Sequence, residues 1–149
     1  MADEIRRPVS VLLDTGAILA ILNQRDPWHE LCFDTFHQLR LPLLTSEAVL
    51  TELFHLVGRF HSDTESAWDF IRSGALTLAT ISDRELPRLH ELMSRYSDHP
   101  MDFADATLVC LAERESISTV FTVDHSDFST YRIASRRRFR ILPAERPSR

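Results

Sequence analysis

Apolar and polar positions along the chain form blocks that predict strands and helices in alternation. Short apolar runs, typical of buried strands, end where polar or turn-forming residues begin. They occupy Val9–Leu13, Leu41–Leu44, Leu76–Thr80 and Ser118–Thr122, with a fifth candidate strand at Arg138–Leu142. Alternation of this kind predicts an α/β fold in which helices cover both faces of a parallel sheet.

Helical patterns fill the intervals between these strands. They cover Ala17–Leu22, Pro27–Leu39, Glu47–Val57 and Asp102–Glu115. Two capping boxes, Ser62–Glu65 and Ser82–Glu85, predict the starts of two further helices. No internal repeat or linker interrupts the pattern, so we expect one domain that spans residues 1–149.

The composition is that of a soluble globular protein, with 44% hydrophobic and 26% charged residues. No apolar run approaches the roughly 18 residues that a membrane helix needs. The first eight residues lack the apolar core of a signal peptide, so we expect a cytoplasmic protein with no membrane contact. Cys32 and Cys110 both lie in apolar helical patterns, which favours two buried free thiols over a disulfide.

Charge is distributed unevenly along the chain. Residues 1–131 hold 10 Arg and 21 acids, a net charge of −11, whereas residues 132–149 hold 7 Arg and 1 acid, a net of +6. The chain contains no Lys, which base composition alone could explain, although Arg also matches phosphate better than Lys does. The dense patch of Arg136, Arg137 and Arg138, with Arg132 and Arg140 nearby, is either a solvated face or a contact for RNA or an acidic partner.

Several common site chemistries are not supported by the motifs. The three glycines, Gly16, Gly58 and Gly74, are too far apart for a phosphate-binding loop. The seven histidines have no metal-ligand spacing, and no G-x-S-x-G nucleophile elbow occurs. Carboxylates remain as the candidate chemistry.

Two of these carboxylates follow predicted strands directly. Asp14 ends the most apolar strand, and Asp124 comes just after the fourth. Ligands of open parallel sheets bind beyond the carboxyl ends of the strands, so two neighbouring strands would bring these acids into one crevice. Each acid taken alone could equally be the N-cap of the helix that follows.

Helical acids add further candidates. Glu52 and Glu47 lie at opposite borders of the apolar arc of one helix, and periodicity does not choose between them. Asp102 and Asp105 share a face at the start of a nearly all-apolar helix. Their negative charges could simply stabilise that helix by interacting with the positive end of its dipole. A buried acid cluster needs a positive partner, and hard divalent ions such as Mg²⁺ prefer carboxylate oxygens.

Four segments together resemble the PIN-domain family and, within it, the VapC-type toxin ribonucleases. They are Val11–Leu19, Leu44–Leu53, Met101–Ala106 and Val120–Asp124 with Asp127-Phe128 behind. Each segment is weakly specific by itself. Their order and spacing cover nearly the whole chain.

The resemblance implies a three-layer α/β/α sandwich with a central parallel sheet and one or two Mg²⁺ or Mn²⁺ ions. It implies metal-binding and catalytic roles for Asp14, Glu52, Asp105 and Asp124, and it favours Glu52 over Glu47. It also makes Thr122 a supporting or phosphate-contacting hydroxyl, with Asp102 and Asp127 as auxiliary acids. The expected activity is metal-dependent endoribonuclease cleavage, with a homodimer and an antitoxin protein as expected partners.

Two other functions remain compatible with the sequence. One is a PIN-like nuclease that matures RNA or cuts DNA, and the other is a PIN-like binding module without catalysis. All the core acids are present, which argues against the binding module.

Overall fold

The computed structural model describes residues 11–58, 61–99 and 101–148, and its core is a five-stranded parallel sheet. The strands are β1 (Val11–Leu13), β2 (Leu43–Ser46), β3 (Leu76–Ala79), β4 (Thr119–Phe121) and β7 (Arg140–Leu142). Their order across the sheet is β3-β2-β1-β4-β7, and every adjacent pair is parallel. The order changes direction at β1, which lies between β2 and β4, and this is where open α/β sheets form a ligand crevice.

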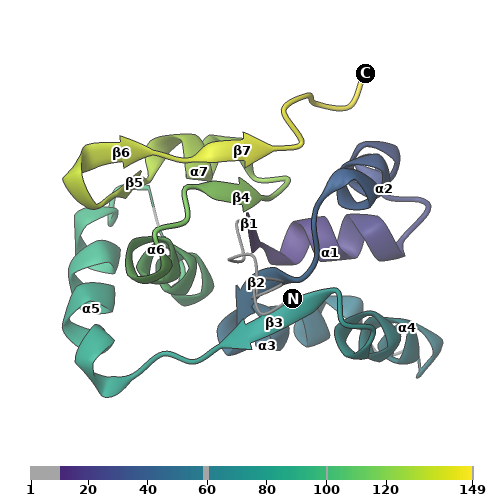
Figure 1. Cartoon of the computed structure of the whole chain (residues 1–149), viewed down its shortest axis with the longest axis horizontal. Coiled ribbons are helices and arrows are strands. Elements are labelled where there is room, and N and C mark those ends of the chain that lie inside the picture. Colours follow the sequence, from purple (N-terminus) through teal and green to yellow (C-terminus); the bar gives the residue numbers. More distant parts are fainter. Residues whose placement is uncertain (1–10, 59–60, 100, 149) are drawn as a thin grey trace, which may run out of the picture.

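Helices connect and flank the strands (Figure 1). They are α1 (Thr15–Leu22), α2 (His29–Gln38), α3 (Glu47–Val57), α4 (His61–Arg72), α5 (Leu86–Arg95), α6 (Phe103–Glu115) and α7 (His125–Thr130). In Figure 1 the sheet runs from β3 near the bottom to β7 near the top, with α5 and α6 to the left and α1 and α2 to the right. The expected three-layer α/β/α sandwich with a central parallel sheet is therefore confirmed.

The hydrophobic core joins the sheet to α6. All three residues of β1 and all four of β2 are buried, as expected for parallel strands covered on both faces. Every residue from Ala104 to Ala112 in α6 is also buried. This burial explains why the helix is apolar nearly all round, and it carries Asp105 into the interior of the protein.

The second strand begins and ends two residues later than the sequence predicts. Thr45 and Ser46 look like turn residues, yet both are buried within β2 and pair in register with β3. Their hydroxyls are satisfied locally, because Thr45 donates to the Leu13 carbonyl at 2.7 Å and Ser46 bonds the Thr107 hydroxyl at 2.8 Å. These hydrogen bonds let polar residues extend a central strand.

Both predicted helix starts are present in the structure. The Ser82–Glu85 capping box is present, and it opens a 3₁₀ turn, η1 (Asp83–Glu85), that leads into α5. The Ser62–Glu65 box also lies at the start of a helix, as predicted, although α4 already includes His61 and Ser62 therefore lies inside its first turn. The sequence also missed α7, which is only 6 residues long.

The chain beyond α7 is more complex than the one strand predicted there. A small antiparallel pair, β5 (Arg132–Ile133) with β6 (Arg137–Arg138), encloses the η2 turn (Ala134–Arg136), and β7 then joins the main sheet.

Val9 and Ser10, predicted as the start of the first strand, lie outside the described residues. Cys32 and Cys110 are buried and free, as expected. Among the described residues, no helix has the length and apolarity needed to span a bilayer.

Candidate active site

Asp14 and Asp124 follow two adjacent strands at the carboxyl edge of the sheet. Leu13 of β1 pairs with Phe121 of β4, so both chains reach this edge together. Each acid is also the N-cap of the helix that follows it: Asp14 accepts from the Thr15 amide at 2.8 Å and Asp124 from the Asp127 amide at 3.2 Å. Capping and site formation are therefore compatible at these two positions.

Thr122 links the two acids. Its buried hydroxyl donates to Oδ2 of Asp14 at 2.7 Å and accepts the backbone N–H of Asp124 at 2.9 Å. One side chain thus fixes the rotamer of Asp14 and the backbone that carries Asp124. Thr122 acts as a support for the acids in this structure.

The start of α6 supplies two more acids. Asp102 caps the helix and accepts the Asp105 amide at 2.7 Å, while Asp105 is largely buried, with 8% of its surface exposed. The hydroxyl of Tyr131 donates to Oδ2 of Asp105 at 2.8 Å. Because Tyr131 is itself fully buried, this hydrogen bond holds Asp105 from the interior side.

Glu52 differs from Glu47 in its surroundings. Glu52 is half-buried and Glu47 is exposed, although both line a cavity of about 700 Å³ that also reaches Asp102 and Phe103. Burial raises the pKa of Glu52 to about 7, with the charges of Asp102, Asp14 and Asp124 adding to the effect. Glu52 is therefore the acid of α3 whose carboxylate interacts with the charges of Asp102, Asp14 and Asp124.

Asp127 lies one helical turn from Asp124 and extends the acidic group. Burial, followed by interactions with Asp127, raises the pKa of Asp124 to about 6. His99 forms a close ion-pair contact with Oδ1 of Asp127 from the segment before α6. Asp127 thus has a potential cationic partner of its own.

Asp14 and Asp105 are the two buried acids of the group. Burial raises the pKa of Asp14, opposed by its bonds to Thr122 and Thr15 and reinforced by Asp102 and Asp127. Burial also raises the pKa of Asp105 to about 8, and the charges of Asp14 and Asp102 add to it. Mutual repulsion of this kind is what a bound cation would relieve.

The donor chemistry fits a hard divalent cation, since every candidate ligand is a carboxylate oxygen. Within residues 11–58, 61–99 and 101–148, no group of three or more acidic, His or Cys side chains is already arranged to hold a metal ion. In this arrangement one oxygen of Asp14 bonds Thr122 and one of Asp105 bonds Tyr131. Metal binding would therefore require the side chains to close toward one another.

Sequence reasoning missed two supporting groups. Tyr131 carries no local motif, and its contact with Asp105 spans 26 positions in the chain. Ser46 accepts the Val49 amide at 3.3 Å as the N-cap of α3 and also bonds Thr107 of α6, which fixes α3 against α6. The capping position of Ser46 was readable from its place before Glu47, but its contact with α6 was not.

Comparison with known proteins assigns the chain to a family. The family profile of the PIN domain matches residues 11–134. The chain belongs to the PIN domain family. A curated member, ribonuclease VapC26 from Mycobacterium tuberculosis, is 30% identical over 135 residues, which cover 89% of this chain and 100% of VapC26.

Solved structures of PIN-fold proteins resemble this one at low sequence identity. VapC20 from Mycobacterium tuberculosis, described as a sarcin-ricin loop cleaving toxin, has a TM-score of 0.67 at 20% identity and covers 74% of this chain and 87% of its own. VapBC2 from Rickettsia felis, bound to a fragment of its promoter DNA, has a TM-score of 0.64 at 17% identity and covers 88% and 97%. FitAB bound to a DNA fragment has a TM-score of 0.60 at 18% identity and covers 79% and 87%. These likenesses support the fold.

Proposed function

We propose that this PIN-domain protein is an endoribonuclease that hydrolyses RNA phosphodiester bonds with a divalent metal ion, the whole chain acting as one nuclease domain. The observation that carries the proposal is the group of acids around the carboxyl ends of β1 and β4, in which Asp14 and Asp105 are buried, Glu52 is half-buried and Asp124 is exposed. Burial raises the pKa of Asp14, Glu52, Asp105 and Asp124, and the charge of a neighbouring acid, Asp102 or Asp127 in the case of Asp14, adds to every one of these shifts. Perturbed acids gathered in this way are typical of functional sites.

We assign metal binding to Asp14, Glu52, Asp105 and Asp124, with Mg²⁺ or Mn²⁺ as the ion. The chemistry that such an ion supplies is activation of an attacking water and neutralisation of phosphate charge. Thr122 and Tyr131 orient Asp14 and Asp105 through their hydroxyl groups. Because the hydroxyl groups of Thr122 and Tyr131 donate to Asp14 and Asp105, we assign binding and orientation to the chain's own side chains and no protein nucleophile.

Asp102 and Asp127 serve as auxiliary acids in this proposal. Asp102 holds the first turn of α6 and so fixes the backbone of Asp105. Asp127 contacts Nε2 of His99 through Oδ1, so one of its carboxylate oxygens already has a partner. Substituting either should weaken activity less than substituting one of the four proposed ligands.

The similarity to VapC26, together with the folds of VapBC2 and FitAB, supports a toxin role with an antitoxin protein as partner. We also propose a homodimer, in which two crevices could act on one RNA. RNA maturation remains the second candidate, because the same acids would serve either role. A small gene encoding a DNA-binding antitoxin directly upstream would favour the toxin role.

The testing experiment is a cleavage assay on mixed RNA and single-stranded DNA, with Mg²⁺ and Mn²⁺ titrated separately. We expect metal-dependent cleavage of RNA, internal products and no cleavage by Asp14→Asn prepared in parallel. Cleavage of DNA alone would mean that DNA, and not RNA, is the substrate. No cleavage of either polymer, with a folded protein that still binds RNA, would favour the binding module.

A further inference from the structure

A basic cavity of about 670 Å³ lies between α5 and the η2 turn, outside the group of acids. Its lining includes four arginines, Arg88, Arg95, Arg132 and Arg136, with the hydroxyl side chains of Tyr96 and Ser135. No acidic residue lines this cavity among the residues that the structure describes. In a chain of net charge −5, such a local excess of cations is suited to an anion.

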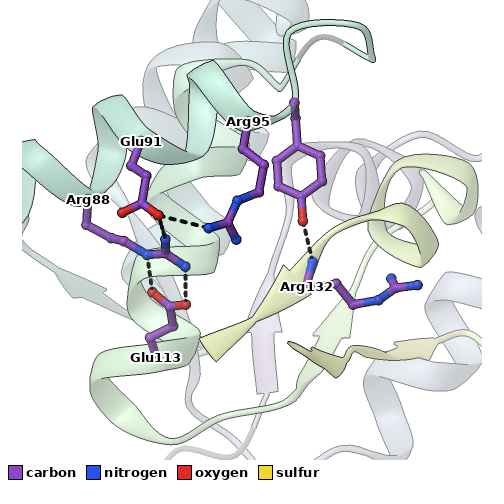
Figure 2. Close-up of polar contacts among 6 residues, drawn as sticks. Arg88, Glu91, Arg95, Glu113 and Arg132 are labelled. Carbon is purple, nitrogen blue, oxygen red and sulfur yellow. Dashed lines mark hydrogen bonds and ion pairs between the residues drawn. The ribbon is translucent and has the colours of Figure 1, made fainter. Parts of the chain in front are cut away.

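Carboxylates beside the cavity offset only part of this charge. Figure 2 shows Arg88 held by Glu113, with bonds of 2.8 and 2.7 Å, and by Glu91 at 3.0 Å. Arg95 shares Glu91 at 2.8 Å, and both partners of this second pair are about half exposed. Arg136 is exposed and has no ion-pair partner within the described ranges. The guanidinium group of Arg132 donates to the backbone carbonyls of Ser129, Thr130 and Tyr131. Two carboxylates therefore pair with Arg88 and Arg95, three carbonyls hold Arg132, and the exposed Arg136 remains for an occupant.

The rim of the cavity also offers neutral donors. The Tyr96 hydroxyl accepts the backbone N–H of Arg132 at 2.9 Å, which leaves its own O–H free to donate to an occupant. Ser135 and Arg136 both have left-handed backbone angles, with φ of 65° and 60°. Consecutive amides in turns of this kind form concave sites for anions. The turn and the guanidinium groups thus favour the same type of ligand.

The cavity adjoins the proposed active site through two tyrosines. Tyr131 donates to Asp105, and its ring packs edge-on against Tyr96 with centroids 5.1 Å apart. Tyr96 lines the cavity, as does Arg132, whose Cα lies about 3.8 Å from that of Tyr131 because the two residues are consecutive. The rings of Tyr131 and Tyr96 therefore stand between Asp105 and the cavity, and an anion in the cavity would belong to a part of the substrate that lies beyond the acids.

We infer that this cavity binds a backbone phosphate of the RNA, outside the group of acids proposed to act on the cleaved bond. The inference rests on the proposed ribonuclease function and adds a substrate subsite to it. A phosphate is favoured because guanidinium groups bind its oxygens in pairs and because successive phosphates of one strand lie close together. The subsite would hold the strand in register beside an otherwise acidic crevice, where phosphates are repelled in the absence of metal.

The test compares RNA affinity in an Asp14→Asn background, in which RNA binds without being cut. The pocket variant is Arg95→Ala/Arg136→Ala. The matched control is Arg72→Ala/Arg84→Ala, which removes the same charge from two exposed arginines that have no ion-pair partner within the described residues and do not line the cavity. Circular dichroism and melting curves check that both variants keep the fold.

We expect the pocket variant to bind RNA at least tenfold more weakly than the control variant. The salt dependence of its binding should be shallower by about 0.7 for each phosphate of the single strand that the variant no longer neutralises. An RNA series with one neutral methylphosphonate at each position in turn locates the phosphate that the cavity binds. A methylphosphonate at one position should weaken RNA binding to the Asp14→Asn parent about tenfold. The same RNA should bind the pocket variant no more weakly than the unmodified RNA does.

The outcomes separate the subsite from the function on which it rests. Equal RNA affinity of the pocket and control variants would overturn the subsite and leave the ribonuclease proposal intact. Failure of the unsubstituted protein to bind or cut any RNA in the presence of Mg²⁺ or Mn²⁺ would overturn both. Unchanged RNA binding with weakened binding of a polyglutamate probe would assign the cavity to an acidic protein segment instead.

Discussion

The hydroxyl of Tyr131 donates a 2.8 Å hydrogen bond to Asp105, and both residues are buried. A donor at this position stabilises the charged carboxylate and opposes the effect of burial on the pKa of Asp105. The same bond fixes the carboxylate rotamer from behind. Tyr131 is therefore a positioning residue for a proposed metal ligand.

We expect Tyr131→Phe to shift the pH profile of cleavage to higher pH. Without the hydroxyl, the pKa of Asp105 rises above its value of about 8, so a higher pH is needed to ionise the ligand. Removing one partner of a buried hydrogen bond also costs about 1–3 kcal/mol of stability. The profile should be measured at subsaturating Mn²⁺, where ligand ionisation limits metal binding.

Tyr96→Phe is the matched control for this substitution. It removes a hydroxyl that bonds the Arg132 amide, so it should lower stability without moving the pH profile. Equal displacement of the profile by both variants would assign the Tyr131 effect to general loosening of the fold.

A second prediction concerns the four proposed ligands. Asp14→Asn, Asp105→Asn and Asp124→Asn should each abolish cleavage while the protein stays folded, because the amide keeps the shape and loses the charge. Glu52→Gln should reduce activity more than Glu47→Gln, since only Glu52 is half-buried among the other acids. Turnover should be compared at saturating Mn²⁺, and parental activity in Asp14→Asn would contradict the assignment.

A third prediction links pH to the stability of the metal-free protein. Burial raises the folded-state pKa of Asp105 to about 8 and of Glu52 to about 7, above their ordinary values of 3.8 and 4.5. The folded state therefore holds more protons than the unfolded state between these values, and stability must fall as pH rises from about 4 to 8. With a chelator present, melting temperature should be lower at pH 8 than at pH 5.

Divalent ions should oppose this loss of stability. Binding at 100 times the dissociation constant adds about 2.7 kcal/mol. Asp105→Asn should melt as high as the parent or higher without metal at pH 8, because one charge of the repelling group is gone, and it should gain less from Mn²⁺. If millimolar Mg²⁺ and Mn²⁺ do not change the melting temperature of the parent protein, the metal assignment is contradicted.

The sequence predicted those parts of the protein that depend on local pattern. Apolar runs located all five strands of the parallel sheet, and the rule that ligands bind beyond strand ends singled out Asp14 and Asp124. Glu52 could not be separated from Glu47 by periodicity, because both lie at borders of the apolar arc. The difference comes from neighbours on other elements, which the pattern of one helix does not contain.

Long-range contacts account for most of what the sequence does not predict. Tyr131 reaches Asp105 only because α7 and β5 place it beside α6. The sequence shows one basic patch near the end of the chain, whereas the cavity combines Arg132 and Arg136 with Arg88 and Arg95 of the earlier helix α5. Thr45 and Ser46 fall outside the predicted second strand because their buried hydrogen-bond partners come from β1 and α6.

The fourth prediction concerns Gly16, which packs against the residue before Asp124. A Cβ at Gly16 would lie 2.5 Å from Cγ2 of Val123, closer than atoms in contact allow. Gly16→Ala should therefore displace the strand ends that carry Asp14 and Asp124, lowering stability by about 1–3 kcal/mol and reducing cleavage. In a Val123→Ala background the obstructing methyl is absent, and the change should be neutral or stabilising by up to about 1 kcal/mol, since Ala favours a helix more than Gly. Urea denaturation of the four proteins in this double-mutant cycle measures the coupling, and cleavage assays follow the site in parallel. An equal cost of Gly16→Ala in both backgrounds would mean that close packing against Val123 is not what requires glycine here.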